Sequence, residues 1–249
     1  MNSNSMQKAI TWIAGARSVA VLTGAGVSKE SGIPTFRDAL SGMWSNYNPE
    51  ELASPQGFRR HPTRVWQWYA SRREKLDEIA PNPAHYALAR LEELKSMTLI
   101  TQNVDGLHDV AGNKKIIELH GNLRRYKCFK KNHPIPLELV KGADDPPSCP
   151  RCGSLARPDV VWFGEMLPFS ALQKARNAAI ECDVMLVIGT SGIVQPAASL
   201  PLYATDAGAF TIEINPEETP LTPYLDLHLA GPAGTIVSAL VAGVEEALR

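Results

Sequence analysis

A glycine-bearing turn follows the first apolar run of the sequence and has the composition of a phosphate-binding loop. Residues 18–22 (SVAVL) are typical of a strand covered on both faces, and the chain continues as Thr23-Gly-Ala-Gly26. Because Gly24 and Gly26 lack a Cβ, backbone N–H groups there can approach a pyrophosphate. Arg37, at the end of the same string, can add a phosphate or ribose contact. The third glycine of the usual G-x-G-x-x-G is missing, so a plain strand-to-helix turn is the structural alternative.

Polar side chains follow the next predicted strand, at 97–101. Gln102, Asn103 and Asp105 offer amide and carboxylate groups that suit a carboxamide or ribose hydroxyls. An Asx turn explains the same residues about as well.

A histidine stands at the end of the apolar run 116–119. His120, followed by Gly121, could act as a general base near neutral pH. A hydrogen-bonded structural histidine is the alternative, and His108 is the nearest competitor for the role of base.

Three cysteines lie close together in the sequence. Cys149-Pro-Arg-Cys152 has the spacing of a zinc knuckle, whereas Cys128 is followed three positions later by Lys131 instead of a second cysteine. His133 is a candidate for the fourth ligand, and Asp144 or Asp145 is a weaker one. A site that is empty, or a module held by packing alone, is the other possibility.

These residues need a scaffold, and the apolar pattern supplies one. Buried-type strands are predicted at 18–22, 97–101, 184–188 and 209–214, with helices near 6–16, 62–78, 84–95, 169–181, 196–206 and 233–248. Ser5 is the candidate cap of the first helix. Alternating strands and helices predict an α/β fold with a doubly wound parallel sheet, which binds ligands at the carboxyl ends of its strands. Gly189-Thr190-Ser191 and Asn215-Pro216 fall at two such ends. The stretch 123–160 breaks the rhythm and is predicted to be a small insert.

Composition narrows the class of protein. The chain has 249 residues, of which 44% are apolar, so one large domain or a large and a small one are expected. The 25 basic and 26 acidic residues give a net charge of −1, which argues against a nucleic-acid binder. No apolar run approaches a membrane span, the first residues lack the layout of a signal peptide, and four cysteines make no disulfide framework. We therefore expect a cytoplasmic protein that binds neither membrane nor nucleic acid.

Six motifs together resemble the sirtuins, which are NAD-dependent protein lysine deacylases. They are 24–37, Gln102-Asn-Val-Asp105, His120-Gly121, Val160-Val-Trp-Phe-Gly-Glu165, Gly189-Thr190-Ser191 and Asn215-Pro216, in family order over about residues 18–235. The resemblance implies a Rossmann-like NAD-binding domain (1–37, 80–122 and 155–249). It also implies a small domain made of a helical insertion (38–79) and a zinc-module-like insert (123–154).

The resemblance also assigns roles. It implies that the acyl group passes from lysine to ADP-ribose with release of nicotinamide and O-acyl-ADP-ribose. His120 would deprotonate a ribose hydroxyl, with Asn103 and Asp105 around the nicotinamide and its ribose. NAD contacts would come from Gly24, Ala25, Gly26, Ser28, Glu30, Ser31, Gly32, Ile33, Pro34, Phe36, Arg37, Gln102, Asn103, Val104, Asp105, Gly189, Thr190, Ser191, Asn215, Pro216 and Ala233. Strand addition to the substrate would use Val160, Val161, Trp162, Phe163, Gly164 and Glu165. Structural zinc would be held by Cys128, Cys149 and Cys152.

A further set resembles the sirtuin subclass that removes succinyl and malonyl groups. Tyr69 and Arg72 are three positions apart in a predicted helix and therefore share a face. Arg72 would grip an acyl carboxylate, Tyr69 would add a hydroxyl donor, and Ala53 would leave room for the longer chain. Arg73 should point elsewhere.

The expected substrates are acylated-lysine proteins, acetyl-lysine among them, and the expected state is a monomer. A plain deacetylase, in which Tyr69 and Arg72 are incidental, and a non-catalytic NAD or ADP-ribose binding module are the alternatives.

Overall fold

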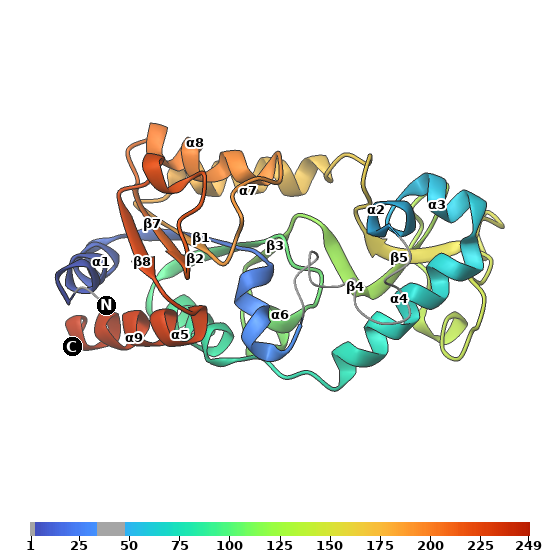
Figure 1. The fold of residues 1–249 in the computed structure, drawn as a ribbon, viewed down its shortest axis with the longest axis horizontal. Coiled ribbons are helices and arrows are strands. Elements are labelled where there is room, and N and C mark those ends of the chain that lie inside the picture. Colours follow the sequence, from blue (N-terminus) through green and yellow to red (C-terminus); the bar gives the residue numbers. More distant parts are fainter. Residues whose placement is uncertain (1–2, 34–47) are drawn as a thin grey trace.

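A six-stranded sheet forms the larger part of the molecule in the computed structural model, which describes residues 3–33 and 48–249 (Figure 1). The strands are β1 (Ser18–Thr23), β2 (Ser96–Thr101), β3 (Ile116–Glu118), β6 (Val184–Ile188), β7 (Phe210–Asn215) and β8 (Leu227–Ala230). Their order is β3-β2-β1-β6-β7-β8, and every neighbouring pair is parallel. This is the Rossmann order, in which the direction of winding reverses between β1 and β6, so a crevice for ligands is expected where these two strands end.

Helices cover both faces of this sheet. One face carries α1 (Ser3–Gly15), α5 (Pro83–Leu94) and α9 (Ala233–Ala247), and the other carries α7 (Phe169–Glu181) and α8 (Leu200–Asp206) (Figure 1). Strand β1 shows why its sequence is apolar without alternation. Val19 and Val21 enter the core under α1, α5 and α9, whereas Ala20 and Leu22 enter the core under α7 and α8.

A smaller domain lies beside the sheet. It contains α2 (Pro49–Leu52), α3 (Pro55–Arg60), α4 (Pro62–Asp77) and an antiparallel pair, β4 (Gly121–Cys128) and β5 (Ala156–Val160) (Figure 1). Its core is built from Phe58, Trp68, Tyr69, Leu123 and Trp162. A second cluster around Trp66, Cys128 and Cys149 adjoins it.

Short elements complete the chain and bring the site residues into place. They are α6 (Leu107–Ala111) and the 3₁₀ helices η1 (Ala25–Ser31), η3 (Leu137–Leu139), η4 (Ala197–Ser199) and η5 (Thr222–Tyr224). Local sequence explains several boundaries. Ser54 accepts a hydrogen bond from the N–H of Gly57 at 3.0 Å and caps α3. Asn82 caps α5 through the N–H of Ala84 at 2.9 Å, and a proline follows each cap.

The predicted α/β class and its doubly wound parallel sheet are confirmed. The first helix begins at Ser3, so Ser5 lies inside it and the prediction that Ser5 caps it was wrong. The helix expected at 196–206 divides into η4 and α8. Strand β8 was not predicted. Among the residues that the structure describes, no helix is both long and apolar enough to cross a membrane.

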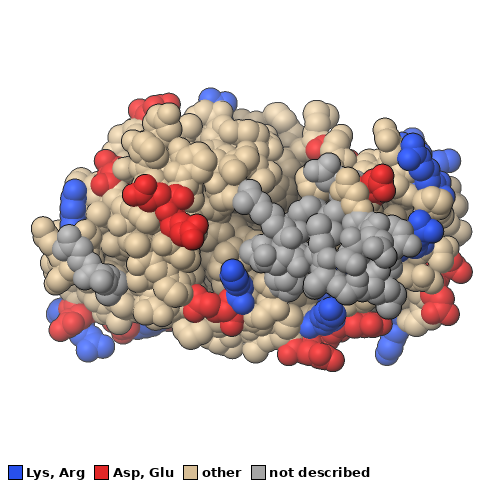
Figure 2. All heavy atoms as spheres, in the orientation of Figure 1, with Lys and Arg blue, Asp and Glu red and all other residues tan. Residues whose placement is uncertain are grey.

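Among the described residues on the face drawn in Figure 2, acidic and basic side chains are interspersed, and neither charge forms a large continuous area. This agrees with the net charge of −1.

Candidate functional site

The turns after β1 and β6 are in direct contact. The N–H of Gly24 donates to the carbonyl of Ile188 at 3.0 Å, and the N–H of Gly26 donates to the carbonyl of Gly189 at 2.8 Å. Gly189 has a φ of 60°, and a Cβ there would lie 2.4 Å from the amide nitrogen of Val27. Only glycine fits so close an approach, so the two turns form one backbone-lined edge at the switch point of the sheet.

Asn103 and Asp105 meet at the buried Ser28. The side-chain amide of Asn103 donates to Ser28 Oγ and to the Gly24 carbonyl, both at 3.1 Å. Ser28 Oγ in turn donates to Asp105 Oδ2 at 2.8 Å, and the N–H of Leu107 donates to Asp105 Oδ1 at 2.9 Å. Burial raises the pKa of Asp105, while its hydrogen bonds from Leu107 and Ser28 act in the opposite direction. Local bonds therefore fix both side chains beside the first glycine turn.

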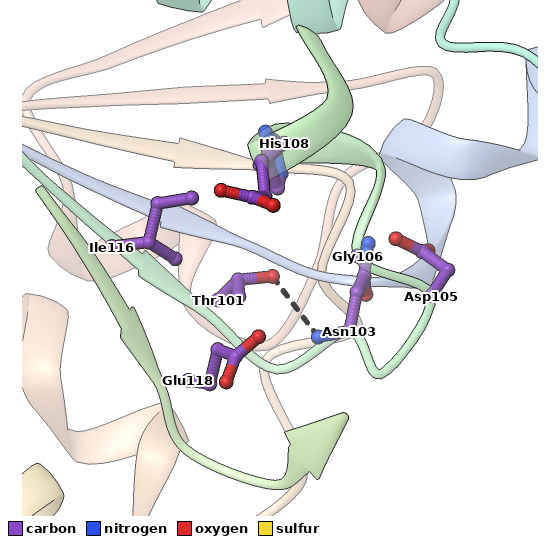
Figure 3. Close-up of a pocket in the computed structure, with 8 residues that line it drawn as sticks. Thr101, Asn103, Asp105, Gly106, His108, Ile116 and Glu118 are labelled. Atoms are coloured by element: carbon purple, nitrogen blue, oxygen red, sulfur yellow. Dashed lines mark hydrogen bonds between the residues drawn. The ribbon is translucent and has the colours of Figure 1, made fainter. Parts of the chain in front are cut away.

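His108 lies behind this group and is unsuited to act as a base. Figure 3 shows it with Asn103 and Asp105 around a small pocket that is also lined by Thr101 and Glu118. Its side chain is 2% exposed, its Nε2 is 3.0 Å from Thr23 Oγ1, and burial lowers its pKa to about 3.

His120 is half-buried and has a defined orientation. Its Nδ1 lies 2.9 Å from the carbonyl of Gln102. Because a carbonyl only accepts hydrogen bonds, Nδ1 carries the proton and Nε2 is left with a lone pair in the neutral ring. Burial lowers the pKa of His120, and the bond to Gln102 opposes this shift. The neutral ring with a basic Nε2 is therefore the form present at neutral pH.

The ends of β2, β6 and β7 are joined by side chains. Gln102 Nε2 donates to Thr190 Oγ1 at 2.9 Å, and Asn215 Nδ2 donates to the Thr190 carbonyl at 2.8 Å. Amide and hydroxyl groups thus gather where a dinucleotide is expected to lie, and they suit its ribose hydroxyls and carboxamide.

The residues expected to select the acyl group lie together in the small domain. Ala53, Tyr69 and Trp162 belong to one buried cluster, and Ile33 and Val104 pack against it. Trp162 Nε1 donates to the Tyr69 hydroxyl at 2.9 Å. The small-domain residues thus adjoin two residues of the predicted NAD set.

Arg72 and Arg73 point to different rings, as expected. The Arg72 guanidinium carbon lies 5.1 Å from the centre of the Trp68 ring. The Arg73 guanidinium lies over Trp66 at 5.2 Å and over Tyr126 at 4.8 Å. Proximity of Arg72 partly offsets the burial that raises the Tyr69 pKa to about 12.

Much of the backbone of segment 160–165 is already bonded within the chain. The N–H of Val161 donates to the His120 carbonyl at 2.9 Å, and the N–H of Phe163 donates to the Ala53 carbonyl at 2.8 Å. The N–H of Trp162 donates to a Glu165 carboxylate oxygen at 2.8 Å. The N–H of Glu165 donates to the Trp162 carbonyl at 2.9 Å, so within the described chain only the N–H of Gly164 among residues 161–165 has no such partner.

The three cysteines converge with a histidine. One ligand atom each from Cys128, His133, Cys149 and Cys152 lies within 4.8 Å of the others. The distance between the sulfurs of Cys128 and Cys152 is 3.6 Å, and that between Cys149 Sγ and His133 Nδ1 is 3.7 Å. Zinc–sulfur bonds of about 2.3 Å in a tetrahedron place sulfurs ~3.8 Å apart, so this donor set fits zinc. His133, one of the alternatives left open by the sequence, completes it.

Several predicted NAD residues have a structural partner instead. The Glu30 carboxylate accepts the N–H of Gly234 at 2.8 Å in the first turn of α9, where Ala233 is buried. Ser31 Oγ accepts from Asn82 Nδ2 at 3.0 Å. Pro34, Phe36 and Arg37 lie outside the described residues.

Two residues that support the site were not predicted from the sequence to do so. His85 Nε2 lies 3.4 Å from Ser28 Oγ, and its Nδ1 accepts the N–H of Asn82 at 3.2 Å. Thr101 Oγ1 accepts the N–H of Asn103 at 3.0 Å (Figure 3). The Asn82-Pro83 pair signals a helix start, but nothing local in the sequence links that helix to Ser28.

Comparison with known proteins decides the family. The model of the Sir2 family matches residues 24–196. The NAD-dependent protein deacylase 1 of Archaeoglobus fulgidus is 51% identical over 243 residues, which cover 97% of this chain and 99% of that protein. This chain belongs to the Sir2 family. A second relative is an NAD-dependent protein deacylase of Thermus thermophilus. It is 54% identical over 221 residues, which cover 86% of this chain and 85% of that protein.

Solved structures of Sir2 proteins agree in fold. A Sir2 homolog–NAD complex matches with a TM-score of 0.92 and 50% identity, covering 98% of this chain and 95% of its own. A structure of Sir2 bound to acetylated peptide matches with a TM-score of 0.84 and 32% identity, covering 98% and 99% of the two chains. The resemblance to the sirtuins drawn from six motifs is thereby confirmed.

Proposed function

We propose that this NAD-dependent protein deacylase prefers lysines whose acyl group ends in a carboxylate, such as succinyl and malonyl. The observation that carries the proposal is the state of Arg72. Its guanidinium is half-buried, lies near the Tyr69 hydroxyl and packs on Trp68, and no carboxylate among the described residues pairs with it. A partly buried cation that lacks an anion among the described residues carries a desolvation cost, and an acidic ligand at this position would offset it.

Tyr69 supports the same preference. Its oxygen accepts the Trp162 indole N–H, so its own proton is the one it can present to a ligand. Because burial raises its pKa to about 12, the hydroxyl stays protonated at neutral pH. A fixed cation and a neutral donor side by side are what a carboxylate needs.

The large domain would hold NAD at the switch point. We infer that the turn from Gly24 to Ser28, with Asn103, Asp105 and Thr190, binds the dinucleotide through backbone N–H groups and polar side chains. When bound, NAD supplies an electrophilic ribose carbon and a nicotinamide leaving group.

His120 would act as the base of the reaction. The Gln102 carbonyl holds the proton on Nδ1, which leaves Nε2 as the atom that accepts a proton from a ribose hydroxyl. The N–H of Val161 bonds to the His120 carbonyl and ties the base to the substrate segment. Holding the reacting groups in one geometry is worth about 7–11 kcal/mol in favourable cases, and that is the main task of these residues.

A panel of acyl peptides tests the proposal. One peptide sequence carrying succinyl-, malonyl- or acetyl-lysine is incubated with the purified protein, with and without NAD, and nicotinamide release is measured. We expect NAD-dependent release from all three peptides and a higher kcat/KM for the succinyl and malonyl peptides. A higher kcat/KM for the acetyl peptide would make the protein a plain deacetylase, and tight ADP-ribose binding without release would make it a binding module.

A further inference from the structure

Arg157 on β5 is a buried arginine that none of the roles above uses. Its side chain is 2% exposed, and its two terminal nitrogens donate to the two carboxylate oxygens of Glu165 at 2.5 and 2.9 Å. The nitrogen Nη2 also donates to the Val160 carbonyl at 2.7 Å. The same Glu165 carboxylate accepts the N–H of Trp162 at 2.8 Å. One guanidinium therefore joins the two ends of segment 160–165 and closes it as a turn.

The guanidinium also fixes the indole ring of Trp162. The Arg157 Cζ lies 3.2 Å from the centre of the Trp162 ring, which is a close stacking contact. At its other edge the indole Nε1 donates to the Tyr69 hydroxyl at 2.9 Å. A continuous chain of contacts thus runs from Glu165 through Arg157 and Trp162 to Tyr69.

Stability alone does not explain an arginine at this position. Within the described residues its Nε has no hydrogen-bond partner although it is buried. A buried ion pair is often no better for stability than apolar side chains of similar volume. The arrangement instead gives a fixed shape to the wall against which the substrate is expected to lie.

We propose that Arg157 is a positioning residue for the acyl substrate, which holds segment 160–165 through Glu165 and orients Tyr69 through Trp162 without touching the substrate itself. The inference about Tyr69 rests on the proposed acyl preference. The inference about segment 160–165 rests only on peptide binding there.

Two variants separate the two effects. Arg157→Met/Glu165→Gln removes both charges together, so no carboxylate is left facing a missing partner. Trp162→Phe keeps an aromatic ring at this position and removes the indole N–H that orients Tyr69, together with part of the ring's volume, which the melting temperature monitors. The kcat and KM are measured for NAD, for the acetyl peptide and for the succinyl peptide, together with the melting temperature.

We expect the double variant to raise the KM for both peptides by about 10- to 100-fold, since a misplacement of about 1 Å can cost ~100-fold. Its KM for NAD should stay within about threefold of the parent value. Trp162→Phe should lower the succinyl-to-acetyl ratio of kcat/KM by about 2- to 10-fold, as for loss of one hydrogen bond.

The control is Arg90→Met, which removes an arginine bonded to Glu93 and Glu245 between α5 and α9. It should leave every KM unchanged. A double variant with a lower melting temperature but unchanged peptide KM, or with equal rises for NAD and peptide, would overturn the positioning role. If the parent protein shows no preference for acidic acyl groups, the proposed function fails. The role of Arg157 is still tested by comparing how far the double variant changes the KM for NAD and the KM for the acetyl peptide.

Discussion

The variant Arg72→Met tests whether the proposed recognition of an acidic acyl group can be separated from catalysis on lysine. The Arg72 guanidinium carbon lies 5.1 Å from the centre of the Trp68 ring, so a methionine keeps apolar contact with that ring while the charge is lost. Hydrogen bonds to a charged group contribute about 1.5–3 kcal/mol, and tenfold corresponds to ~1.4 kcal/mol. The expected fall in kcat/KM for the succinyl peptide is therefore about 10- to 150-fold.

The same variant should leave the acetyl peptide within about threefold, because an acetyl group carries no carboxylate for Arg72 to bind. Arg73→Met is the matched control: it makes the same change one position along α4, where the guanidinium lies over Trp66 and Tyr126. It should reduce neither substrate selectively. Initial rates of nicotinamide release at varied peptide concentration give the two kcat/KM values. Equal losses on succinyl and acetyl peptides would refute the assignment of Arg72 to the acyl carboxylate.

Three further predictions concern Gly189 in the turn after β6, the proposed base His120, and His133 beside the three cysteines. Gly189→Ala places a Cβ 2.4 Å from the Val27 nitrogen at a φ of 60°. It should therefore lower the free energy of unfolding by about 1–3 kcal/mol and raise the KM for NAD. Denaturant unfolding measures the first effect and NAD titration the second. Burial lowers the pKa of His120, and in the proposed role as base its neutral ring is the active form. The kcat/KM should therefore be level at neutral pH and fall only as the pH drops through a value below 6.5; an acid limb centred above 6.5 would contradict this role. His133→Ala should lower the zinc content and the melting temperature of the protein, whereas His133→Cys should retain zinc. The metal content is measured on purified protein. Equal metal content in both variants would show that His133 is not a zinc ligand.

Local patterns determined the scaffold. The runs that became β1 and β6 are apolar on successive residues because both faces of the sheet are covered, and this leaves a signal within five or six residues. In β2 and β7 polar residues interrupt the apolar ones, and Thr211 and Glu213 of β7 are buried all the same. Strand β8 has only four residues and lies at the edge of the sheet, so the same signal was too weak there. The glycine turns and His120 were found because each comes directly after an apolar run that predicts a strand.

Contacts between distant segments were decided by tertiary structure. The fold of the loop between β4 and β5 determines which of Asp144, Asp145 and His133 lies beside the cysteines. Backbone hydrogen bonds place His133 there, such as the one from the N–H of Cys128 to the His133 carbonyl at 2.8 Å. The sequence did not indicate a role for Arg157. Its contacts with Trp162 and Glu165 form only when the chain folds, and so does the link from Trp162 to Tyr69, which belongs to a separate helix. A sequence records residue types and near-neighbour spacing. Burial, and with it the pKa of His120 and of Tyr69, arises only when segments far apart in the chain exclude water from one another.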